Sequence, residues 1–284
     1  MAPVRTLDTN LLEACSRSEP GSEMTERSPS NPPASIDTST EVTAAVLVIG
    51  DEILSGRTKE ANAGYIADVL TAAGIRLKEI RVVADVEADI VEALNTLRSR
   101  FSYVFTTGGI GPTHDDITAQ SVATAFGREI DVDQRALDLM MPHYRARGVE
   151  LTPSRLRMAR IPQGAELIPN RITAAPGFQI ENVFIMAGVP AIMQVMLDEV
   201  LPKLRTGRKL LSQTIKVAAP EGEVADLLTG HQNSFPAIAM GSYPSFAGGV
   251  MRCELVLRSI DAEALTNAAA ALRQKLSNAR INHN

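Results

Sequence analysis

The chain has 284 residues, a net charge of −5 at pH 7 and 45% hydrophobic residues. That content is enough to bury the core of one large domain or of two smaller ones. Lysine and arginine form no dense cluster, and no apolar run reaches the ~18 residues of a membrane span, so we expect neither a nucleic-acid partner nor a membrane. The two cysteines lie far apart, which predicts no disulfide framework or thiolate metal site and favours the cytoplasm.

Residues 1–43 differ in composition from the rest of the chain. They are rich in Ser, Thr, Pro and Glu and lack hydrophobic periodicity, so we expect a disordered tail. The tail has no apolar segment like that of a secretory signal, and its acidic residues argue against a transit peptide. Met24, rather than Met1, could be the true translation start. After the tail we expect two domains, over residues 44–204 and 205–284.

Strands and helices alternate in the first part of residues 44–204. The expected order is a strand at Ala44–Ile49, a helix at Asn62–Ala73, a strand at Ile75–Val83, a helix at Glu87–Arg98, a strand at Tyr103–Thr107 and a helix at Ala119–Phe126. Continuous apolar runs predict buried strands, and apolar residues at helical spacing predict helices. The alternation predicts an α/β fold with a mostly parallel sheet and helices on both faces. Such sheets bind ligands at the carboxyl ends of their strands.

The remaining elements depart from this simple alternation. We expect helices at Asp133–Arg147 and Pro153–Arg160, an irregular excursion or hairpin at Glu166–Phe178, a strand at Val183–Met186 and a helix at Ala191–Leu204. In the second domain we expect a strand at Gln213–Ala218, a helix at Glu221–Thr229, strands at Ala237–Ser242 and Val250–Ser259, and a helix at Ala262–Leu276. This β-α-β-β-α order predicts a small α+β domain close to a split βαβ unit. His231, at the expected end of a helix, suggests a C-cap rather than a catalytic role.

The most informative segment is the loop after the third strand, Gly108-Gly109-Ile110-Gly111-Pro112-Thr113-His114-Asp115-Asp116-Ile117-Thr118. Its glycines allow a close approach of backbone to ligand, and the amides of the next helix favour a phosphate. Two adjacent carboxylates would repel a phosphate unless a divalent cation lay between them. A structural alternative makes Asp115 a helix N-cap, Asp116 a residue favourable to the helix dipole, and the glycines simple turn formers.

Two motifs resemble signatures of a known family. Ile49-Gly50-Asp51-Glu52-Ile53-Leu54-Ser55-Gly56, followed by Thr58 and Asn62, resembles the opening signature of the molybdopterin-binding-like domain of competence/damage-inducible protein A. Gly108–Thr118 resembles the second signature of that family. The segments Val122–Gly127 and Gly241–Pro244 are similar to the N-terminal part of bifunctional FAD synthases, and the resemblance covers about Ala44 to Leu276.

The resemblance implies a three-layer α/β/α fold of the MoaB/Mog type, with a small C-terminal α+β domain. It implies metal-dependent cleavage of a nucleotide diphosphate such as FAD or ADP-ribose, with Asp85 and Asp116 as catalytic acids. An alternative for Asp85 is a helix N-cap. The expected ligands of a Mg, Mn or Co type ion are Asp115, Asp116 and Asp51. The expected phosphate- or nucleotide-binding residues are Gly50, Thr58, Asn62, Gly108, Gly109, Gly111, Thr113, Thr118, Gly188 and Pro190.

Several alternatives stay open at this point. Gly188 and Pro190 could serve only the turn, Asp51 could cap the turn after the first strand, and Glu52 could be a solvated charge. Ala187 stands where the family usually has proline, which removes a backbone restraint but no polar group. The fold also suits a pterin-binding or adenylyl-transferring module, or an interaction protein without chemistry.

The expected partner is a small-molecule nucleotide or pterin, and we expect a homo-oligomer. Since the chain ends after the small domain, we expect neither the amidohydrolase reaction of many relatives nor the adenylyltransferase reaction of FAD synthases.

Overall fold

The computed structural model describes residues 41–247 and 250–284. The prediction of a disordered tail over residues 1–43 therefore lies almost entirely outside the described residues. Within the two described ranges, no helix combines the length and apolarity needed to cross a bilayer.

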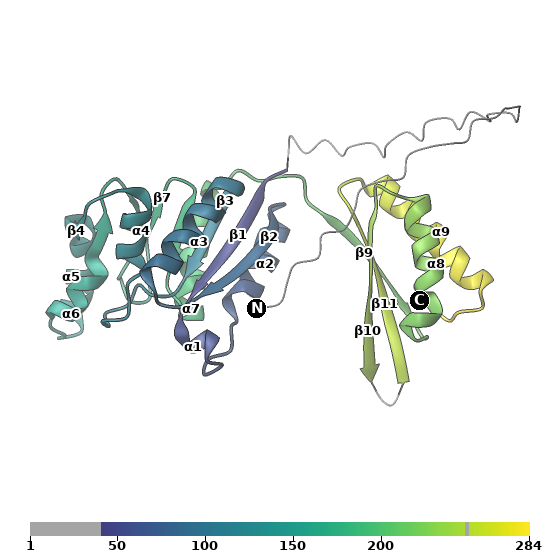
Figure 1. The fold of residues 1–284 in the computed structure, drawn as a ribbon, viewed down its shortest axis with the longest axis horizontal. Coiled ribbons are helices and arrows are strands. Elements are labelled where there is room, and N and C mark those ends of the chain that lie inside the picture. The colour runs from purple at the N-terminus through teal and green to yellow at the C-terminus, as the bar shows by residue number, and fades with distance from the viewer. Residues whose placement is uncertain (1–40, 248–249) are drawn as a thin grey trace, which may run out of the picture. The chain divides into compact units, whose positions relative to one another are not determined.

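Six strands form the sheet of the first domain in the order β2–β1–β3–β8–β7–β6 (Figure 1). Their bounds are β1 Thr43–Ile49, β2 Arg76–Val83, β3 Tyr103–Thr107, β6 Glu166–Ile168, β7 Gly177–Ile180 and β8 Val183–Met186. Strands β2, β1, β3 and β8 are parallel, whereas β7 is antiparallel to β8 and β6 is antiparallel to β7. The mostly parallel sheet is as predicted, and the segment Glu166–Phe178 contributes to an antiparallel hairpin.

Helices cover both faces of this sheet. Their bounds are α2 Asn62–Ala72, α3 Glu87–Arg100, α4 Thr118–Phe126, α5 Gln134–Ala146 and α7 Pro190–Val200. Successive side chains of a strand point to opposite faces. On β1, Ala45, Leu47 and Ile49 pack with α3, α4 and α5. The intervening Val46 and Val48 pack with α2 and α7. Burial on both faces explains why β1 is a continuous apolar run rather than an alternating one.

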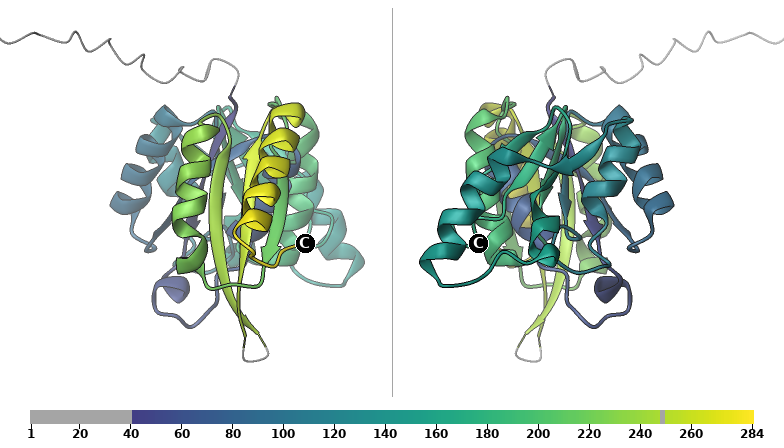
Figure 2. Two further views of the ribbon diagram at one scale, coloured as in Figure 1. Left: turned by 90° about the vertical axis from the view of Figure 1, so that its right-hand side faces the viewer. Right: turned by 90° about the vertical axis from the view of Figure 1, so that its left-hand side faces the viewer.

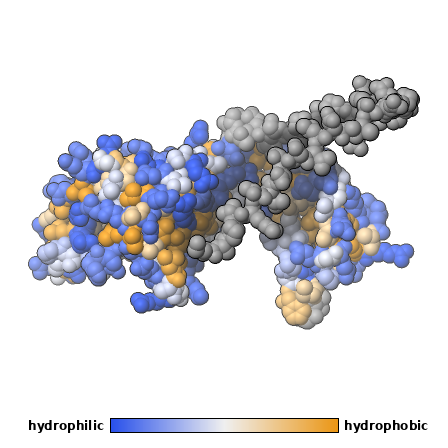
Figure 3. All heavy atoms as spheres, in the orientation of Figure 1, coloured by the Kyte–Doolittle hydropathy of each residue, from blue (hydrophilic) through white to orange (hydrophobic). Residues whose placement is uncertain are grey.

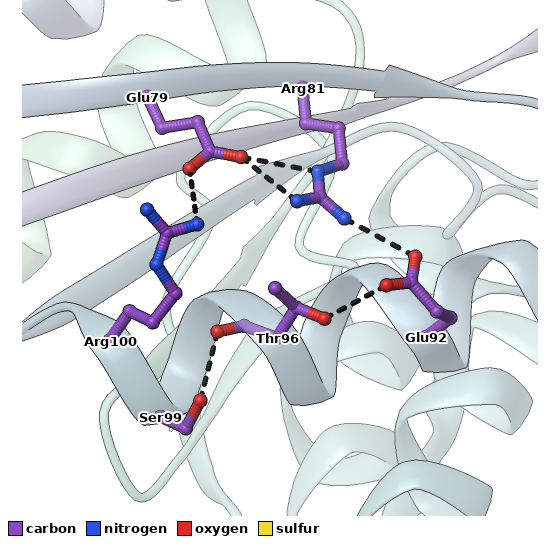
Figure 4. Close-up of polar contacts among 6 residues, drawn as sticks. All are labelled: Glu79, Arg81, Glu92, Thr96, Ser99 and Arg100. Carbon is purple, nitrogen blue, oxygen red and sulfur yellow. Dashed lines mark hydrogen bonds and ion pairs between the residues drawn. The ribbon is translucent and has the colours of Figure 1, made fainter. Parts of the chain in front are cut away.

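An ion-pair network joins the outer strand β2 to α3 (Figure 4). Arg81 lies 3.0 Å from Glu79 on the same strand and 3.2 Å from Glu92 on α3. Arg100, at the end of α3, reaches back to Glu79 at 2.9 Å. Isolated exposed ion pairs contribute little stability. Here Glu79 and Arg81 each have two partners, so the pairs together restrict the movement of α3 relative to β2. The network thus holds α3 along the edge of the sheet.

Short elements account for the differences from the sequence-based predictions. They are α1 Asp51–Leu54, β4 Ile130–Val132, α6 Pro153–Leu156, the 3₁₀ turn η2 Arg157–Ala159, β5 Arg160–Pro162 and the 3₁₀ turn η3 Leu201–Lys203. The helix predicted over Pro153–Arg160 is only partly correct. It stops after one turn because Arg160–Pro162 pairs with β4 and buries Ile161. Strand pairing at a distance in sequence overrides the local preference here.

The second domain has one three-stranded antiparallel sheet in the order β10–β11–β9. Its elements are β9 Leu211–Val217, α8 Glu221–Ser234, β10 Ala239–Ala247, β11 Val250–Ser259 and α9 Ala262–Asn278. Because β11 is antiparallel to both neighbours, β9 and β10 are parallel with β11 inserted between them, which is the predicted split βαβ arrangement. Helices α8 and α9 lie side by side on one face of this sheet (Figure 2).

Hydrophobic surface is visible at the free end of the β10–β11 hairpin (Figure 3). Phe246 is 71% exposed there, and Met251, its partner in register, is also exposed. The nearby Tyr243 is exposed as well, and its hydroxyl accepts a hydrogen bond from Arg258 at 3.1 Å. The Gly241–Pro244 segment lies within β10.

His231 does not cap a helix end, so that prediction was wrong. It lies inside α8 and is fully buried, and its Nε2 is 2.9 Å from the carbonyl oxygen of Ala268 on α9. Because a carbonyl oxygen only accepts, Nε2 carries the proton. Nδ1 is buried without a partner among the described residues, and the ring packs against Phe235. The imidazole is a link between the two helices of the domain.

We expect the stability of the second domain to fall in mild acid because of His231. Burial lowers the pKa of His231, although the Ala268 carbonyl opposes that shift. The unfolded chain binds a proton near pH 6.5 while the folded chain resists it, so stability is lost as pH falls below that value, by at most about 1.4 kcal/mol per pH unit. Urea unfolding at pH 7.5 and 5.5 would measure the loss, which His231→Gln should largely remove. His114→Gln, at an exposed histidine, should retain the wild-type loss, and an unchanged loss in His231→Gln would contradict the assignment.

Candidate functional site

Three loops meet at the carboxyl ends of neighbouring parallel strands. They follow β1, β3 and β8 and contain Gly50, Gly108 and Gly188. Gly108 has a φ of 105°, and a Cβ atom there would lie 2.1 Å from the carbonyl oxygen of Ile49. A Cβ atom on Gly188 would lie 3.2 Å from the Cα of Gly108. Glycine at these positions lets the three loops approach more closely than side chains would allow.

A cavity of about 650 Å³ opens beside these loops. Its lining comprises Glu52, Thr58, Gly108, Gly109, Ile110, Gly111, Pro112, Asp116, Tyr144, Arg155, Met158, Asn170, Thr173, Ala175, Pro176, Ala187, Gly188, Val189, Pro190, Ile192 and Met196. The volume lies within the range typical of small-molecule sites, and the mixture of apolar side chains with a few polar groups is also typical of them. The cavity lies where parallel α/β sheets bind their ligands.

Thr118 holds the glycine loop from beneath. Its hydroxyl donates to the carbonyl oxygen of Gly108 at 3.0 Å, and its backbone N–H donates to the carbonyl oxygen of Gly109 at 3.0 Å. The residue is fully buried and does not line the cavity. A Cβ atom on Gly109 would lie 2.1 Å from this hydroxyl oxygen. The two hydrogen bonds of Thr118 to the loop therefore require glycine at position 109. The structure therefore places Thr118 behind the loop rather than beside a ligand.

Asp116 closes the second half of the loop. Its Oδ2 accepts hydrogen bonds from the backbone N–H of Thr113, at 2.8 Å, and from the Thr113 hydroxyl. A Cβ atom on Gly111 would lie 2.6 Å from the same oxygen. Gly111 therefore leaves room for the carboxylate to fold over the loop. Asp116 also lines the cavity.

The helix-capping alternatives for the acidic residues are not what the structure shows. Helix α4 begins at Thr118, and its N-cap is Ile117, with no side-chain cap. Asp115 is therefore not the N-cap that the alternative required. The N-cap of α3 is Val86, likewise without a side-chain cap, so Asp85 does not cap α3.

Asp85 instead holds the turn after β1. Its Oδ2 accepts a hydrogen bond from the backbone N–H of Asp51 at 2.9 Å. Partial burial raises the pKa of Asp85, and the charges of Asp51, Glu52 and Asp115 raise it further. These carboxylates thus form an acidic edge close to the glycine loop. Even so, the described part of the chain contains no group of three or more His, Cys, Asp or Glu residues placed to hold a metal ion.

The predicted site residues divide into two sets. Those that line the cavity are Thr58, Gly108, Gly109, Gly111, Asp116, Gly188 and Pro190. Those outside its lining are Gly50, Asp51, Asn62, Asp85, Thr113, Asp115 and Thr118. Among the second set, Asn62 lines a smaller neighbouring recess, and Thr113 uses both its donors on Asp116. Gly50 lies next to the side chain of Glu52, which itself lines the cavity.

Sequence reasoning missed the far wall of the cavity. Tyr144 and Arg155 come from α5 and α6, with the guanidinium carbon 5.6 Å from the centre of the aromatic ring. Asn170 orders the next segment, since its side chain bonds to the Thr173 hydroxyl and the Ala175 carbonyl oxygen. No local motif marks these residues. Only the folding of the chain between β4 and β5, and of the segment around Asn170, over the glycine loop brings them to the site.

Arg157 was also missed, although it contacts the loop directly. Its guanidinium donates to the carbonyl oxygen of Asp116 at 3.2 Å and reaches that of His114 at 3.5 Å. The positive charge adjoins the two loop carboxylates without pairing with either one in a salt bridge. Arg157 thus fixes the backbone of the acidic segment through its carbonyl oxygens.

Comparison with known proteins identifies the family of both parts of the chain. Residues 45–206 match the family described as "Probable molybdopterin binding domain", and residues 209–284 match "FAD synthase, middle domain". The first match spans more than half of the chain. A crystal structure described as the protein CinA with unknown function, from Thermoplasma acidophilum, is 33% identical with a TM-score of 0.53. The match covers 58% of this chain and 98% of that one.

The chain is a CinA-like member of the molybdopterin-binding domain family. A CinA-like protein of Citrifermentans bemidjiense is 41% identical over 246 residues, which are 82% of this chain and 58% of the relative. A protein of Caldivirga maquilingensis is 41% identical over 179 residues, which are 61% of this chain and 70% of the relative. This chain therefore spans somewhat more than half the length of the CinA-like relative.

Proposed function

We propose that the protein is a divalent-metal-dependent nucleotide pyrophosphatase that hydrolyses FAD or ADP-ribose. One observation carries the proposal: the same loop gives the cavity both free backbone donors and a carboxylate. Among the described residues, the N–H groups of Gly109, Ile110 and Gly111 donate to no protein acceptor, and Asp116 lines the cavity beside them. Amides of this kind receive phosphate oxygens, whereas the carboxylate suits a cation.

The donor set fits a small, hard cation. Magnesium is commonly held by one or two carboxylates together with substrate phosphates and water, so a ready cluster of three protein ligands is not required. Asp116 would hold the ion, with Asp115 and Asp51 as the further expected ligands. The ion would neutralise charge on the diphosphate and lower the pKa of a bound water.

The remaining roles belong to the chain's own groups. The free loop amides bind and orient the phosphate, and their fixed direction favours the charge that develops during cleavage. Arg157 keeps the acidic segment in place through the carbonyl oxygens of His114 and Asp116. Asp85 positions the turn that carries Asp51 and Glu52.

The test is a panel assay with FAD, ADP-ribose and related nucleotide diphosphates in the presence of Mg²⁺, Mn²⁺ or Co²⁺. We expect release of a nucleoside monophosphate that stops with excess chelator and returns when a divalent ion is added. Chromatographic quantification of the products measures both states. Full turnover after exhaustive removal of metal would eliminate the mechanism, as would the absence of product with every substrate and ion.

A second candidate is binding or adenylylation of a pterin in the same cavity. The match to a family described as molybdopterin-binding favours it. Adenylyl transfer would consume ATP and release pyrophosphate only when a pterin phosphate is present, whereas the pyrophosphatase needs neither addition. The same chromatographic assay separates the two reactions.

A further inference from the structure

A small polar recess adjoins the cavity and contains two buried polar atoms without protein partners. Its volume is about 60 Å³, and it shares Glu52, Thr58, Gly108, Gly188 and Pro190 with the lining of the cavity. Asn62 and Thr107 also line the recess. Asn62 is 6% exposed and Thr107 is 1% exposed. Their Oδ1 and Oγ1 atoms are buried and unpartnered among the described residues.

The hydrogen-bonding sense of Asn62 is fixed. Its Nδ2 donates to the carbonyl oxygen of Gly188 at 2.7 Å, so the amide cannot be reversed without placing two acceptors together. Its backbone N–H is also occupied, because it donates to Glu60 at 2.8 Å. The free atom, Oδ1, is therefore an acceptor that needs a donor. Thr107 offers a hydroxyl, which can donate or accept.

Unpaired polar atoms at this depth are uncommon, because an unsatisfied buried donor or acceptor keeps its full desolvation penalty. The recess can hold water, whose share of liquid volume is about 30 Å³. A ligand group that replaces such a water gains affinity only if it reproduces the same hydrogen bonds. The matching group must donate to Asn62 and can accept from Thr107, which describes a hydroxyl.

A phosphate does not suit this recess. It offers only acceptors at neutral pH and would face the Asn62 Oδ1 and the carboxylate of Glu52. Lys59 also lines the recess, but its single positive charge is offset by Glu52 and Glu60. The phosphates therefore belong at the free amides of the glycine loop. Since Gly108 lines both hollows, the group in the recess must be close to the phosphates.

We propose that the site takes a nucleoside diphosphate with its phosphates at the glycine loop and a sugar hydroxyl hydrogen-bonded to Asn62 and Thr107. In such a ligand the sugar is attached directly to the phosphates, whereas the base lies farther away. This assignment rests on the proposed function for its substrate class. It adds the orientation of the ligand and names Thr107 as a binding residue.

The strand itself supplies a matched control. Thr106 is fully buried, and its Oγ1 is likewise unpartnered among the described residues. Successive residues of β3 point to opposite faces of the sheet, so Thr106 does not line the recess. Thr106→Val and Thr107→Val thus remove equivalent hydroxyls with little change of shape. Neither should destabilise the fold, because each hydroxyl lacks a protein partner.

The experiment is calorimetric binding of ADP, 2′-deoxy-ADP and 3′-deoxy-ADP in the presence of Mg²⁺. We expect wild-type protein to bind one deoxy analogue about 3- to 10-fold more weakly than ADP, as the loss of one hydrogen bond predicts. Thr107→Val should bind ADP more weakly by a similar factor and no longer distinguish that analogue. Thr106→Val should behave as wild type.

Several results would overturn the orientation: equal binding of all three ligands by wild type, unchanged discrimination in Thr107→Val, or no binding of ADP. The comparison of analogues on wild-type protein decides the point even if a variant fails to fold. Calorimetry measures binding alone, and the product assay described above measures hydrolysis. Hydroxyl-dependent binding without hydrolysis would therefore refute only the pyrophosphatase. Hydrolysis without hydroxyl discrimination would refute only the orientation.

Discussion

Replacing Asp116 by asparagine should lower the turnover of FAD or ADP-ribose by about 100-fold or more, equivalent to roughly 2.7 kcal/mol in the activation barrier. The substitution removes the charge that a hard cation needs but keeps the size of the side chain. Asparagine can still accept a hydrogen bond from the Thr113 N–H, so the loop should retain its shape. Steady-state kinetics with saturating metal, together with thermal unfolding, would separate a catalytic loss from a structural one.

Asp131→Asn provides the matched control for this substitution. Its carboxylate also accepts a backbone hydrogen bond, from Val132 at 2.7 Å, but the residue is not in the lining of the cavity. We expect wild-type turnover from this variant. Near wild-type turnover in Asp116→Asn, on a substrate that the wild-type protein hydrolyses, would exclude Asp116 as a metal ligand.

Replacing Gly108 by alanine should destabilise the first domain by about 3–5 kcal/mol. The new methyl group would be 2.1 Å from the carbonyl oxygen of Ile49, and the φ of 105° is unfavourable for a side chain. Relief would require β1 and β3 to separate at the ends that form the site. Urea unfolding followed by circular dichroism measures the loss, and binding of ADP should fall with it.

Gly164→Ala separates the backbone effect from the collision. Gly164 has a φ of 84°, but nothing lies within 4 Å of an added Cβ atom there. We expect a cost of only about 1–2 kcal/mol, the usual penalty for a left-handed side chain. If Gly108→Ala and Gly164→Ala lowered the free energy of unfolding equally, the close approach of Gly108 to Ile49 would contribute nothing to the loss.

The parts of the structure that the sequence predicted are those fixed by local pattern. The apolar run of β1 is buried on both faces, and β3 has the predicted bounds Tyr103–Thr107. Helix α4 ends at Gly127, whose φ of 60° is the left-handed conformation expected of a glycine that follows a helix. The glycine loop lies at the cavity because strand order and parallel pairing follow from the same alternation.

The parts that could not be predicted depend on residues far apart in sequence. Tyr144 and Arg155 reach the cavity only because the chain between β4 and β5 folds over the loop. The capping role considered for Asp85 failed because the N–H of Asp51, 34 positions earlier, competes for its carboxylate. His231 was assigned to a helix end because the partner that draws it inward, Ala268, belongs to another helix.

The strand order of the second domain has a consequence for synthesis on the ribosome. The central strand, β11, is the last of the three to be made, and it alone pairs with both β9 and β10. While residues 250–259 are still inside the ribosome, the released part of the chain contains β9 and β10. These two strands do not pair with one another, because β11 lies between them in the sheet. Formation of this sheet must therefore wait until residues 250–259 have left the ribosome. The six strands of the preceding domain have all left the ribosome by then and can already be folded, since domains generally fold as units in the order of their synthesis.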